Sequence, residues 1–287
     1  REAAVRAFVP VPFWSVDCVL APAGGSGAPL SAALRALPGG APVPSPGLTD
    51  AATAESAAAA LAASTLVVAS ATARDVARSP PPPFVTASLQ QAASALLGMS
   101  PSETMSIAQA LYEGGDAAGG EPLITYMRTD GVSMPPAAVD AARDAAVAVH
   151  GAASVPKTPR VWTTRAKNAQ EAHEAIRPTD ARRAPSSLPP AVGRRHRALY
   201  DLIWRRTLAS QMADARLKAH RVDVDAVAGP AAGARLRAAA TAVVAPGFSA
   251  AYAPADIRAA HAADKREDRE AAAAEAEAEA DAAADAD

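Results

Sequence analysis

The hydrophobic pattern of the chain changes its period twice, and this constrains the fold more than any other feature. Before the SPPPP run at 79–83, the segments 1–20 and 64–78 are rich in β-branched and aromatic side chains, which is typical of strands. The prolines form a rigid break, and after them apolar residues recur at helical spacing. Strand-like segments return at 216–227 and 234–252. The pattern therefore predicts an α+β fold with a helical part inserted between strands.

The domain division that follows is discontinuous. We expect residues 1–79 and 213–254 to form one β-domain, which carries an Ala/Pro-rich loop at 21–62. Residues 80–212 form the mainly helical domain. Residues 255–287 are Ala/Glu/Asp repeats with no apolar face to bury, so we expect a disordered acidic tail.

Helix boundaries follow from periodicity, prolines and glycines. We expect helices near 50–62 and over 86–97, 101–113, 135–149, 168–176 and 194–212. Gly98 stands where a glycine commonly ends a helix. Asn168 and Glu171 have the spacing of a capping box.

Alanine carries most of the hydrophobic content. Half of the residues are hydrophobic but only 4 % are aromatic, and alanine buries little area, so a core made of it is thin. The single cysteine, Cys18, excludes an internal disulfide framework and a multi-cysteine zinc site. No apolar run reaches the roughly 20 residues of a membrane helix, so we expect no membrane association.

The net charge of −2 conceals an asymmetry. Residues 265–287 carry −6, whereas 156–222 hold fifteen Lys/Arg and five Asp/Glu, a local +10. Rings are interleaved with this basic stretch, among them Trp162, His173, Tyr200 and Trp204. Such a stretch attracts a phosphate backbone. A solvated arginine-rich face explains the charge equally well, and composition leaves both interpretations open.

The segment 123–130 (LITYMRTD) could carry chemistry. A tyrosine hydroxyl with a pKa near 10 is a poor nucleophile unless neighbouring cations stabilise the developing charge. On a strand, residues i and i+2 point to the same side, so Arg128 could reach a phosphate attacked by Tyr126. A buried core tyrosine beside a surface arginine is the commoner case.

The segment 167–180 (KNAQEAHEAIRPTD) is the second candidate. On a helix, Gln170, His173 and Glu174 would share one face. No second histidine follows at the spacing of a zinc motif. By spacing alone, a capped helix with a satisfied polar face explains the segment better than a site.

Together these segments resemble the active-site signatures of type IA DNA topoisomerases, in the bacterial topoisomerase I branch. Matching residues are Gln109, Leu111, Tyr112 and Glu113, then ITYMRTD at 124–130 and HEAIRPT at 173–179. Further matches follow the family's order at 1–14, 83–91, 200–212 and 245–252. The resemblance covers roughly 1–14 and 64–252.

The resemblance implies roles for individual residues. Tyr126 would attack a phosphate of single-stranded DNA and hold the 5′-phosphate covalently. Arg128 would neutralise that phosphate, and His173 would orient it or transfer a proton. With Arg128, the DNA-binding residues would be Arg160, Arg165, Lys167 and Arg177. The strands would form the family's arch-shaped gate.

The chain departs from the family pattern in three ways. Gly131 stands where many members have serine, and the spacer 114–121 is longer and richer in glycine. The family's TOPRIM domain, which would bind Mg²⁺, is not recognisable, so we expect an internal piece of a longer protein with no metal ligands of its own.

Two functions follow from this resemblance. The first is ATP-independent relaxation of negatively supercoiled DNA by a monomer. The alternative is a catalytically incomplete module that only binds single-stranded DNA. The compartment stays open between a bacterial cytoplasm or nucleoid and a eukaryotic organelle.

Overall fold

The computed structural model describes residues 1–21, 28–114, 120–163 and 174–252 of the 287-residue chain. The chain divides into two compact units. Unit 1 contains Arg1–Val76 and Leu217–Val244, and unit 2 contains Ala77–Arg216 and the residues from Ala245 onward.

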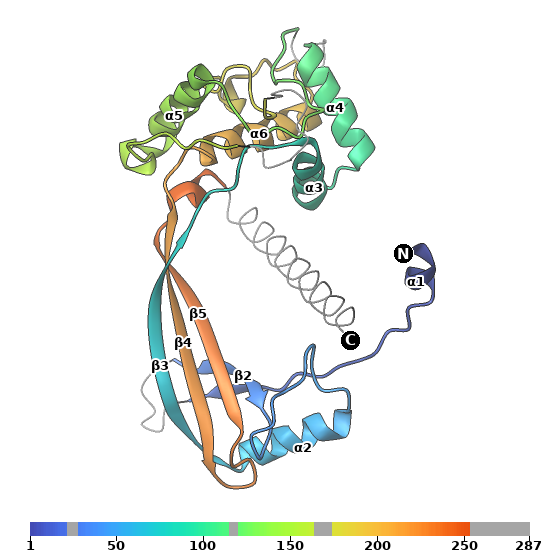
Figure 1. Cartoon of the computed structure of the whole chain (residues 1–287), viewed down its shortest axis with the longest axis vertical. Helices are drawn as coiled ribbons and strands as arrows, with labels where there is room; N and C mark the ends of the chain where they lie inside the picture. Colours follow the sequence, from blue (N-terminus) through green and yellow to red (C-terminus); the bar gives the residue numbers. More distant parts are fainter. Residues whose placement is uncertain (22–27, 115–119, 164–173, 253–287) are drawn as a thin grey trace, which may run out of the picture. The chain divides into compact units, whose positions relative to one another are not determined.

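The strands build one five-stranded sheet in the order β1-β2-β5-β4-β3. Their bounds are β1 Asp17–Leu20, β2 Leu30–Ala36, β3 Thr65–Arg78, β4 Ala215–Ala228 and β5 Arg235–Ala245. The pairs β1–β2 and β2–β5 are antiparallel, and β3, β4 and β5 are the long strands in Figure 1. The fold is a mixed α+β fold with an antiparallel sheet.

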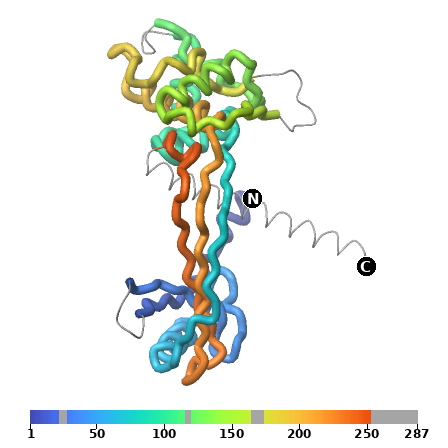
Figure 2. The backbone as a smooth tube through the Cα atoms, turned by 90° about the vertical axis from the view of Figure 1, so that its left-hand side faces the viewer, coloured from blue at the N-terminus to red at the C-terminus, as the bar shows by residue number. Residues whose placement is uncertain are grey.

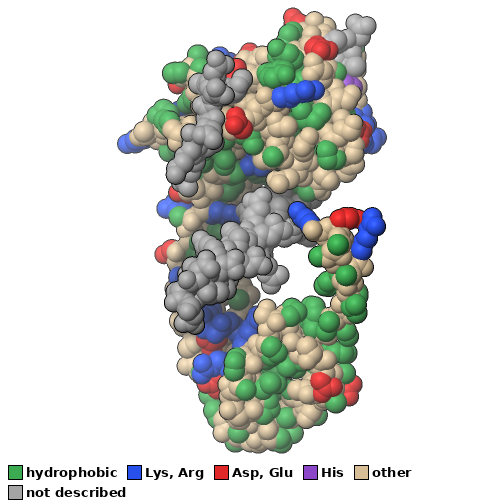
Figure 3. All heavy atoms as spheres, turned by 45° about the vertical axis from the view of Figure 1, so that its right-hand side comes forward, with side chains coloured by type: hydrophobic (Ala, Val, Ile, Leu, Met, Phe, Trp, Pro, Cys, Tyr) green, Lys and Arg blue, Asp and Glu red, His purple; other side chains and the backbone are tan. Residues whose placement is uncertain are grey.

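The core of unit 1 is built largely from alanine. Its helices are α1, Glu2–Arg6, and α2, Ala51–Ala62. The Asp50 carboxylate begins α2 by accepting hydrogen bonds from the backbone N–H groups of Ala52 and Thr53. Seven of the thirteen buried residues in this core are alanines, and the others are leucines and valines. Apolar side chains are also common on the face shown in Figure 3, and Phe8 of the N-terminal segment is 72 % exposed.

Two expectations for unit 1 are wrong in part. Within residues 1–20, only Asp17–Leu20 is a strand, and Glu2–Arg6 is helical. Residues 21–62 are not only loop and helix, because Leu30–Ala36 forms β2 between β1 and β5. The sequence LSAALRA has no β-branched residue, so this strand owes its existence to pairing on both sides rather than to local propensity.

Unit 2 is mainly helical. Its α-helices are α3 Thr86–Leu97, α4 Pro101–Glu113, α5 Pro136–His150 and α6 Arg194–Ala209. Its short 3₁₀ turns are η2 Ala152–Ser154, η3 Pro185–Ser187 and η4 Gly247–Ala251. Helix α6 contacts α3, α4, α5 and η4, and Figures 1 and 2 show it among the other helices of this unit.

Local signals set several of these boundaries. As predicted, Gly98 ends α3 in the left-handed region, with φ of 62°. Helix α4 begins with Ser100, whose hydroxyl accepts a hydrogen bond from the Glu103 N–H at 3.1 Å. Helix α6 ends at Ala209, three residues before the expected end.

The helix expected at 168–176 is wrong in its described part. Residues 164–173 lie outside the described residues, and Glu174–Ile176 is extended. The Ala175 N–H donates to the Ser133 carbonyl at 2.9 Å, and the Ile176 N–H donates to the Phe84 carbonyl at 2.8 Å. These long-range partners satisfy the backbone groups that a helix would have used internally.

The expectation that residues 245–252 belong with the strands of the β-domain is wrong, because Gly247–Ala251 is a 3₁₀ turn that belongs to unit 2. The Phe248 N–H donates to the Ala213 carbonyl at 2.8 Å, and the Phe248 ring is buried in the core of unit 2. None of the helices in the described part of the chain is both long and apolar enough to cross a membrane.

Candidate active site

The segment that carries Tyr126 alternates between buried and exposed side chains. From Thr125 onward, the side chains of Thr125, Met127 and Thr129 are buried, whereas those of Tyr126, Arg128 and Asp130 are exposed; Leu123 and Ile124 before them are both buried. Ile124 makes a β-bridge to Pro178, whereas Met127 and Arg128 form a bend, so the sharing of one side by Tyr126 and Arg128 stays a prediction. Because the Tyr126 side chain is 44 % exposed, the structure excludes the buried-core interpretation of this tyrosine.

One side of the segment is bonded to residues 175–177. The Thr125 N–H donates to the Arg177 carbonyl at 2.9 Å, and the Thr125 hydroxyl donates to the Ala175 carbonyl at 2.7 Å. The Arg177 N–H returns a bond to the Thr125 hydroxyl oxygen at 3.0 Å. The residue directly before Tyr126 is thus held by three hydrogen bonds.

The other side is bonded to the beginning of α3. The Thr86 hydroxyl donates to the Met127 carbonyl at 2.7 Å and accepts from the Thr129 N–H at 2.9 Å. The Thr86 N–H donates to the Thr129 carbonyl at 3.0 Å. Tyr126 therefore projects from a backbone that is anchored both before and after it.

Tyr112, at the end of α4, contacts the Tyr126 ring. The two ring centroids lie 5.3 Å apart and the ring planes meet at 67°, an edge-to-face arrangement. The Leu123 N–H donates to the Leu111 carbonyl at 2.8 Å, which ties the last turn of α4 to the tyrosine segment. Sequence analysis placed Tyr112 in a family motif but did not predict this contact, because residues so far apart in sequence carry no mutual spacing signal.

Gly114 allows α4 to approach this closely. Its φ is +73°, and a Cβ atom added there would lie 2.5 Å from the backbone of Glu121 and Pro122. Any other residue would meet both the strain of the left-handed region and this backbone.

Among the predicted DNA-binding residues that the structure describes, Arg128 is the one without an intramolecular partner. It is exposed, and within the described residues its side chain makes no hydrogen bond or ion pair. Three other predicted residues, Arg165, Lys167 and His173, lie outside the described part of the chain.

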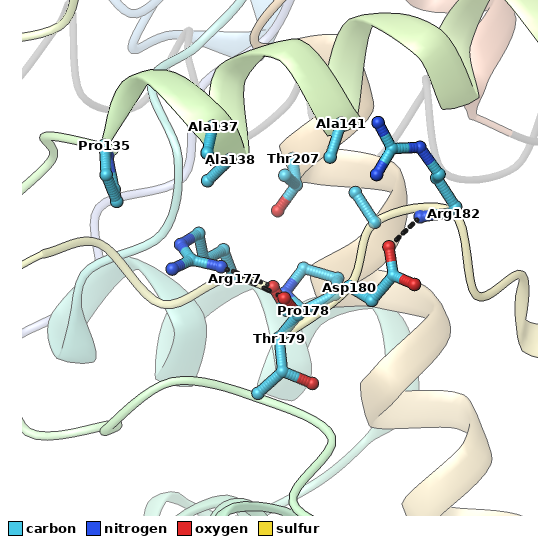
Figure 4. A pocket seen from close by; sticks show the side chains of 11 residues that line it. Pro135, Ala137, Ala138, Ala141, Arg177, Pro178, Thr179, Asp180, Arg182 and Thr207 are labelled. Atoms are coloured by element: carbon cyan, nitrogen blue, oxygen red, sulfur yellow. Dashed lines mark hydrogen bonds between the residues drawn. The ribbon is translucent and has the colours of Figure 1, made fainter.

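Arg177 has intramolecular partners. Its Nε and Nη2 atoms donate to one oxygen of Glu174 at 3.0 and 2.8 Å, and Nη1 donates to the Pro178 carbonyl at 2.9 Å. The side chain is only 14 % exposed. It also lines a cavity of about 300 Å³ beside the first turn of α5, which Figure 4 shows with Thr179 and Asp180.

Arg160 is held in the same manner. Its Nη2 pairs with Asp214 at 2.5 Å and its Nε donates to the Met212 carbonyl at 2.8 Å. The buried Gln211 side chain exchanges two hydrogen bonds with the Arg160 backbone. The positive charge of Arg160 and Arg177 predicted DNA contacts, but both guanidinium groups have intramolecular partners: Arg160 bonds to Met212 and Asp214, more than fifty residues away, and Arg177 to its sequence neighbours.

Two further side-chain contacts stabilise unit 2 and were not predicted from the sequence. The Arg206 guanidinium lies 4.4 Å from the centroid of the Phe84 ring, a cation–π contact. Tyr200 donates its hydroxyl to the Arg183 carbonyl at 2.7 Å, and burial raises the pKa of this phenol above its ordinary value. Tyr200 is therefore a structural tyrosine, in contrast to the exposed Tyr126.

The described residues provide no ligand set for a metal ion. Among them, no group of three or more His, Cys, Asp or Glu side chains comes together. The described part of the chain therefore does not fit a resident Mg²⁺.

Comparison with known proteins gives a consistent result. The sequence profile of the DNA topoisomerase family matches residues 1–284. DNA topoisomerase 1 of Xylella fastidiosa (strain Temecula1) is 46 % identical over 174 residues, which cover 59 % of this chain and 20 % of that protein. DNA topoisomerase 1 of Rickettsia bellii is 48 % identical over 137 residues, covering 47 % and 17 %.

The fold agrees with this sequence similarity. The structure of full-length topoisomerase I from Thermotoga maritima matches with a TM-score of 0.66 and 30 % identity, over 88 % of this chain and 37 % of that one. The matched region thus spans about a fifth of the two bacterial relatives. This chain belongs to the bacterial type IA DNA topoisomerase family and corresponds to part of topoisomerase I.

Proposed function

We propose that Tyr126 is the nucleophile of a DNA transesterification. The phenol oxygen attacks a backbone phosphorus and loses its proton, and the bond between phosphorus and the 3′ oxygen breaks. The 3′ oxygen leaves as a hydroxyl after taking up a proton, and the 5′-phosphate remains on Tyr126. The observation that carries the proposal is an exposed tyrosine on an anchored segment, with an unengaged arginine two residues later.

Arg128 is proposed to bind the scissile phosphate. A guanidinium presents a planar fork of N–H donors that matches phosphate oxygens. It would offset the negative charge that builds up on the phosphoryl group during attack. His173 is proposed to orient the same phosphate or to transfer the proton.

The longer protein is proposed to relax negatively supercoiled DNA. The phosphotyrosine preserves the energy of the phosphodiester bond, so rejoining needs no ATP. The family uses Mg²⁺ through its TOPRIM domain, and we assign the ion to that domain rather than to this chain. The strands of unit 1 are proposed as the gate domain, and the protein as a monomer.

A second function has its own support. The stretch 156–222 carries a formal +10, which favours binding of single-stranded DNA even without cleavage. In this case the chain acts as a structural DNA-binding module.

Covalent trapping tests the proposal and separates the two functions. The chain, alone and joined to a TOPRIM domain, is mixed with 3′-end-labelled single-stranded DNA and Mg²⁺, denatured and examined for label on the protein. We expect label from the joined form, none from its Tyr126→Phe variant, and retained label from Tyr112→Phe, which removes the hydroxyl of another exposed tyrosine. Label that persists in Tyr126→Phe overturns the assignment of the nucleophile. Binding without any label in either form favours the second function.

A further inference from the structure

We propose that Tyr112 is a positioning residue, which holds the Tyr126 ring in the orientation needed for attack. This inference rests on the proposed function of Tyr126 and adds a residue to which the resemblance assigned no role. The observation behind it is the edge-to-face contact, with ring centroids 5.3 Å apart and planes at 67°.

An exposed nucleophile needs such a contact. The hydrogen bonds of Thr125 and Thr129 fix the backbone on both sides of Tyr126, but they leave the two side-chain torsions of the tyrosine undetermined. A 44 % exposed ring makes few packing contacts that could restrict those torsions. An aromatic neighbour in edge-to-face geometry favours one ring orientation over the others.

Tyr112 stands on a rigid base. Leu111, next to it in the last turn of α4, is fully buried, and its carbonyl accepts the Leu123 N–H. Gly114 brings the end of α4 against the Glu121–Pro122 backbone. Glu103, in the first turn of α4, pairs with Arg195 of α6 at 2.5 Å. The ring of Tyr112 is therefore carried by the core of unit 2 and not by a loose loop.

The contact leaves both tyrosines accessible. Tyr112 is 37 % exposed and Tyr126 44 %, so Tyr112 is neither a core-filling residue nor a cover over the nucleophile. The face-to-edge contact uses the rings, and no hydrogen bond joins the two hydroxyl groups among the described interactions. The aromatic ring of Tyr112, rather than its hydroxyl, must then do the positioning.

Two substitutions separate the ring from the hydroxyl. Tyr112→Leu removes the ring, and Tyr112→Phe keeps it as the matched control. In the protein form that gives the Tyr126 adduct, single-turnover cleavage is measured at saturating DNA, and DNA affinity is measured separately. We expect Tyr112→Leu to slow cleavage about three- to tenfold with affinity changed less than twofold, and Tyr112→Phe to stay within twofold of the parent on both counts.

Three other results would contradict a positioning role for Tyr112. Equal losses in the leucine and phenylalanine variants would assign the effect to the hydroxyl and overturn the proposal. A loss of DNA affinity with cleavage intact would make Tyr112 a DNA contact instead. A leucine variant within twofold of the parent, in a protein whose Tyr126→Phe variant forms no adduct, would reject positioning while the nucleophile assignment stands.

A second measurement does not depend on activity. The four tyrosines of the chain are replaced by 3-fluorotyrosine, and the fluorine resonance of Tyr126 is assigned with Tyr126→Phe. We expect this resonance to shift in Tyr112→Leu, because the neighbouring ring current is lost, and to stay near its parent position in Tyr112→Phe. An unchanged resonance in the leucine variant contradicts the contact itself, even if no cleavage is ever detected.

Discussion

The cores of the two units differ in the size of the side chains they bury. More than half of the buried core of unit 1 is alanine, and among its described residues the core contains no aromatic residue or methionine. The core of unit 2 buries Phe84, Tyr200, Trp204 and Phe248, together with three methionines. Because larger side chains bury more apolar area, unit 2 can hold an exposed tyrosine segment rigidly, whereas unit 1 depends more on strand pairing.

Polar contacts compensate for part of this difference. On the sheet of unit 1, Asp223 accepts from Arg221 and Arg237, and Asp225 pairs with Arg235. The Ser64 hydroxyl links the end of α2 to the turn between β4 and β5. We therefore expect the stability of the two units to respond differently to a loss of buried volume, to a lost hydrogen bond and to low pH.

The largest effect is expected from Phe84→Ala in unit 2. The substitution removes a fully buried ring that also lies against Arg206. We therefore expect the free energy of unfolding to fall by about 3–5 kcal/mol. Urea denaturation followed by circular dichroism measures the change. A loss below about 1 kcal/mol would contradict the view that large side chains hold this unit together.

Gly114→Ala should have the next largest effect. The new Cβ would clash with the Glu121–Pro122 backbone, and Gly114 is in the left-handed conformation. We therefore expect the free energy of unfolding to fall by about 2–3 kcal/mol. Gly98→Ala is the matched control, because Gly98 also has a positive φ but no atom within 4 Å of the added Cβ, and it should cost about 1 kcal/mol. Equal losses in the two variants would show that crowding at α4 is unimportant.

In unit 1, Ser64→Ala tests the dependence on polar links. The Ser64 hydroxyl donates to the Ala60 carbonyl at 2.7 Å and accepts from the Ala231 N–H at 2.8 Å. Ala231 is fully buried, so its N–H would lose its acceptor, at a cost of about 1–3 kcal/mol. Thermal denaturation measures the loss of stability, and hydrogen exchange measures the protection of the Ala231 amide. Unaltered protection of that amide would contradict the hydrogen bond to Ser64.

The smallest effect at neutral pH concerns Asp223. Hydrogen bonds from Arg221 and Arg237 lower the pKa of this carboxyl to about 2. Because the folded pKa lies below the unfolded one, near 3.9, the stabilisation is complete above the unfolded pKa and is lost as pH falls from about 4 towards 2. We expect the free energy of unfolding to fall over that range, and to fall less in Asp223→Asn.

Asp75→Asn, on an exposed stretch of β3, is the control for this prediction. Urea titrations from pH 6 to pH 2 compare the parent and both variants. Identical pH dependence in the parent and Asp223→Asn would show that the two arginines do not couple this carboxyl to folding.

Sequence reasoning predicted α3, α4 and α5 to within about a residue because their boundaries are written locally. Prolines begin α4 and α5, and Gly98 ends α3. It missed β2 and assigned Glu174–Ile176 to a helix. In both cases the backbone conformation is decided by partners distant in sequence, which no local spacing reveals.

For the site, the structure shows that Tyr126 and Arg128 are both exposed, and the prediction that they point to the same side remains a prediction. Charge alone could not distinguish Arg128 from Arg160 and Arg177, since a guanidinium has the same charge whether or not a carboxylate holds it. Only the structure shows that Arg177 is paired with Glu174 and Arg160 with Asp214.

The sequence by itself determined the family and the main helices, and it predicted Tyr126 as the nucleophile. These conclusions rest on local patterns of side-chain type, periodicity and helix caps, which can be recognised without knowledge of the fold. The tertiary structure decided that β2 exists, that Thr86 and Thr125 anchor the tyrosine segment, and that Tyr112 meets Tyr126. These are contacts between residues far apart along the chain, and their energy arises only when packing brings the partners together.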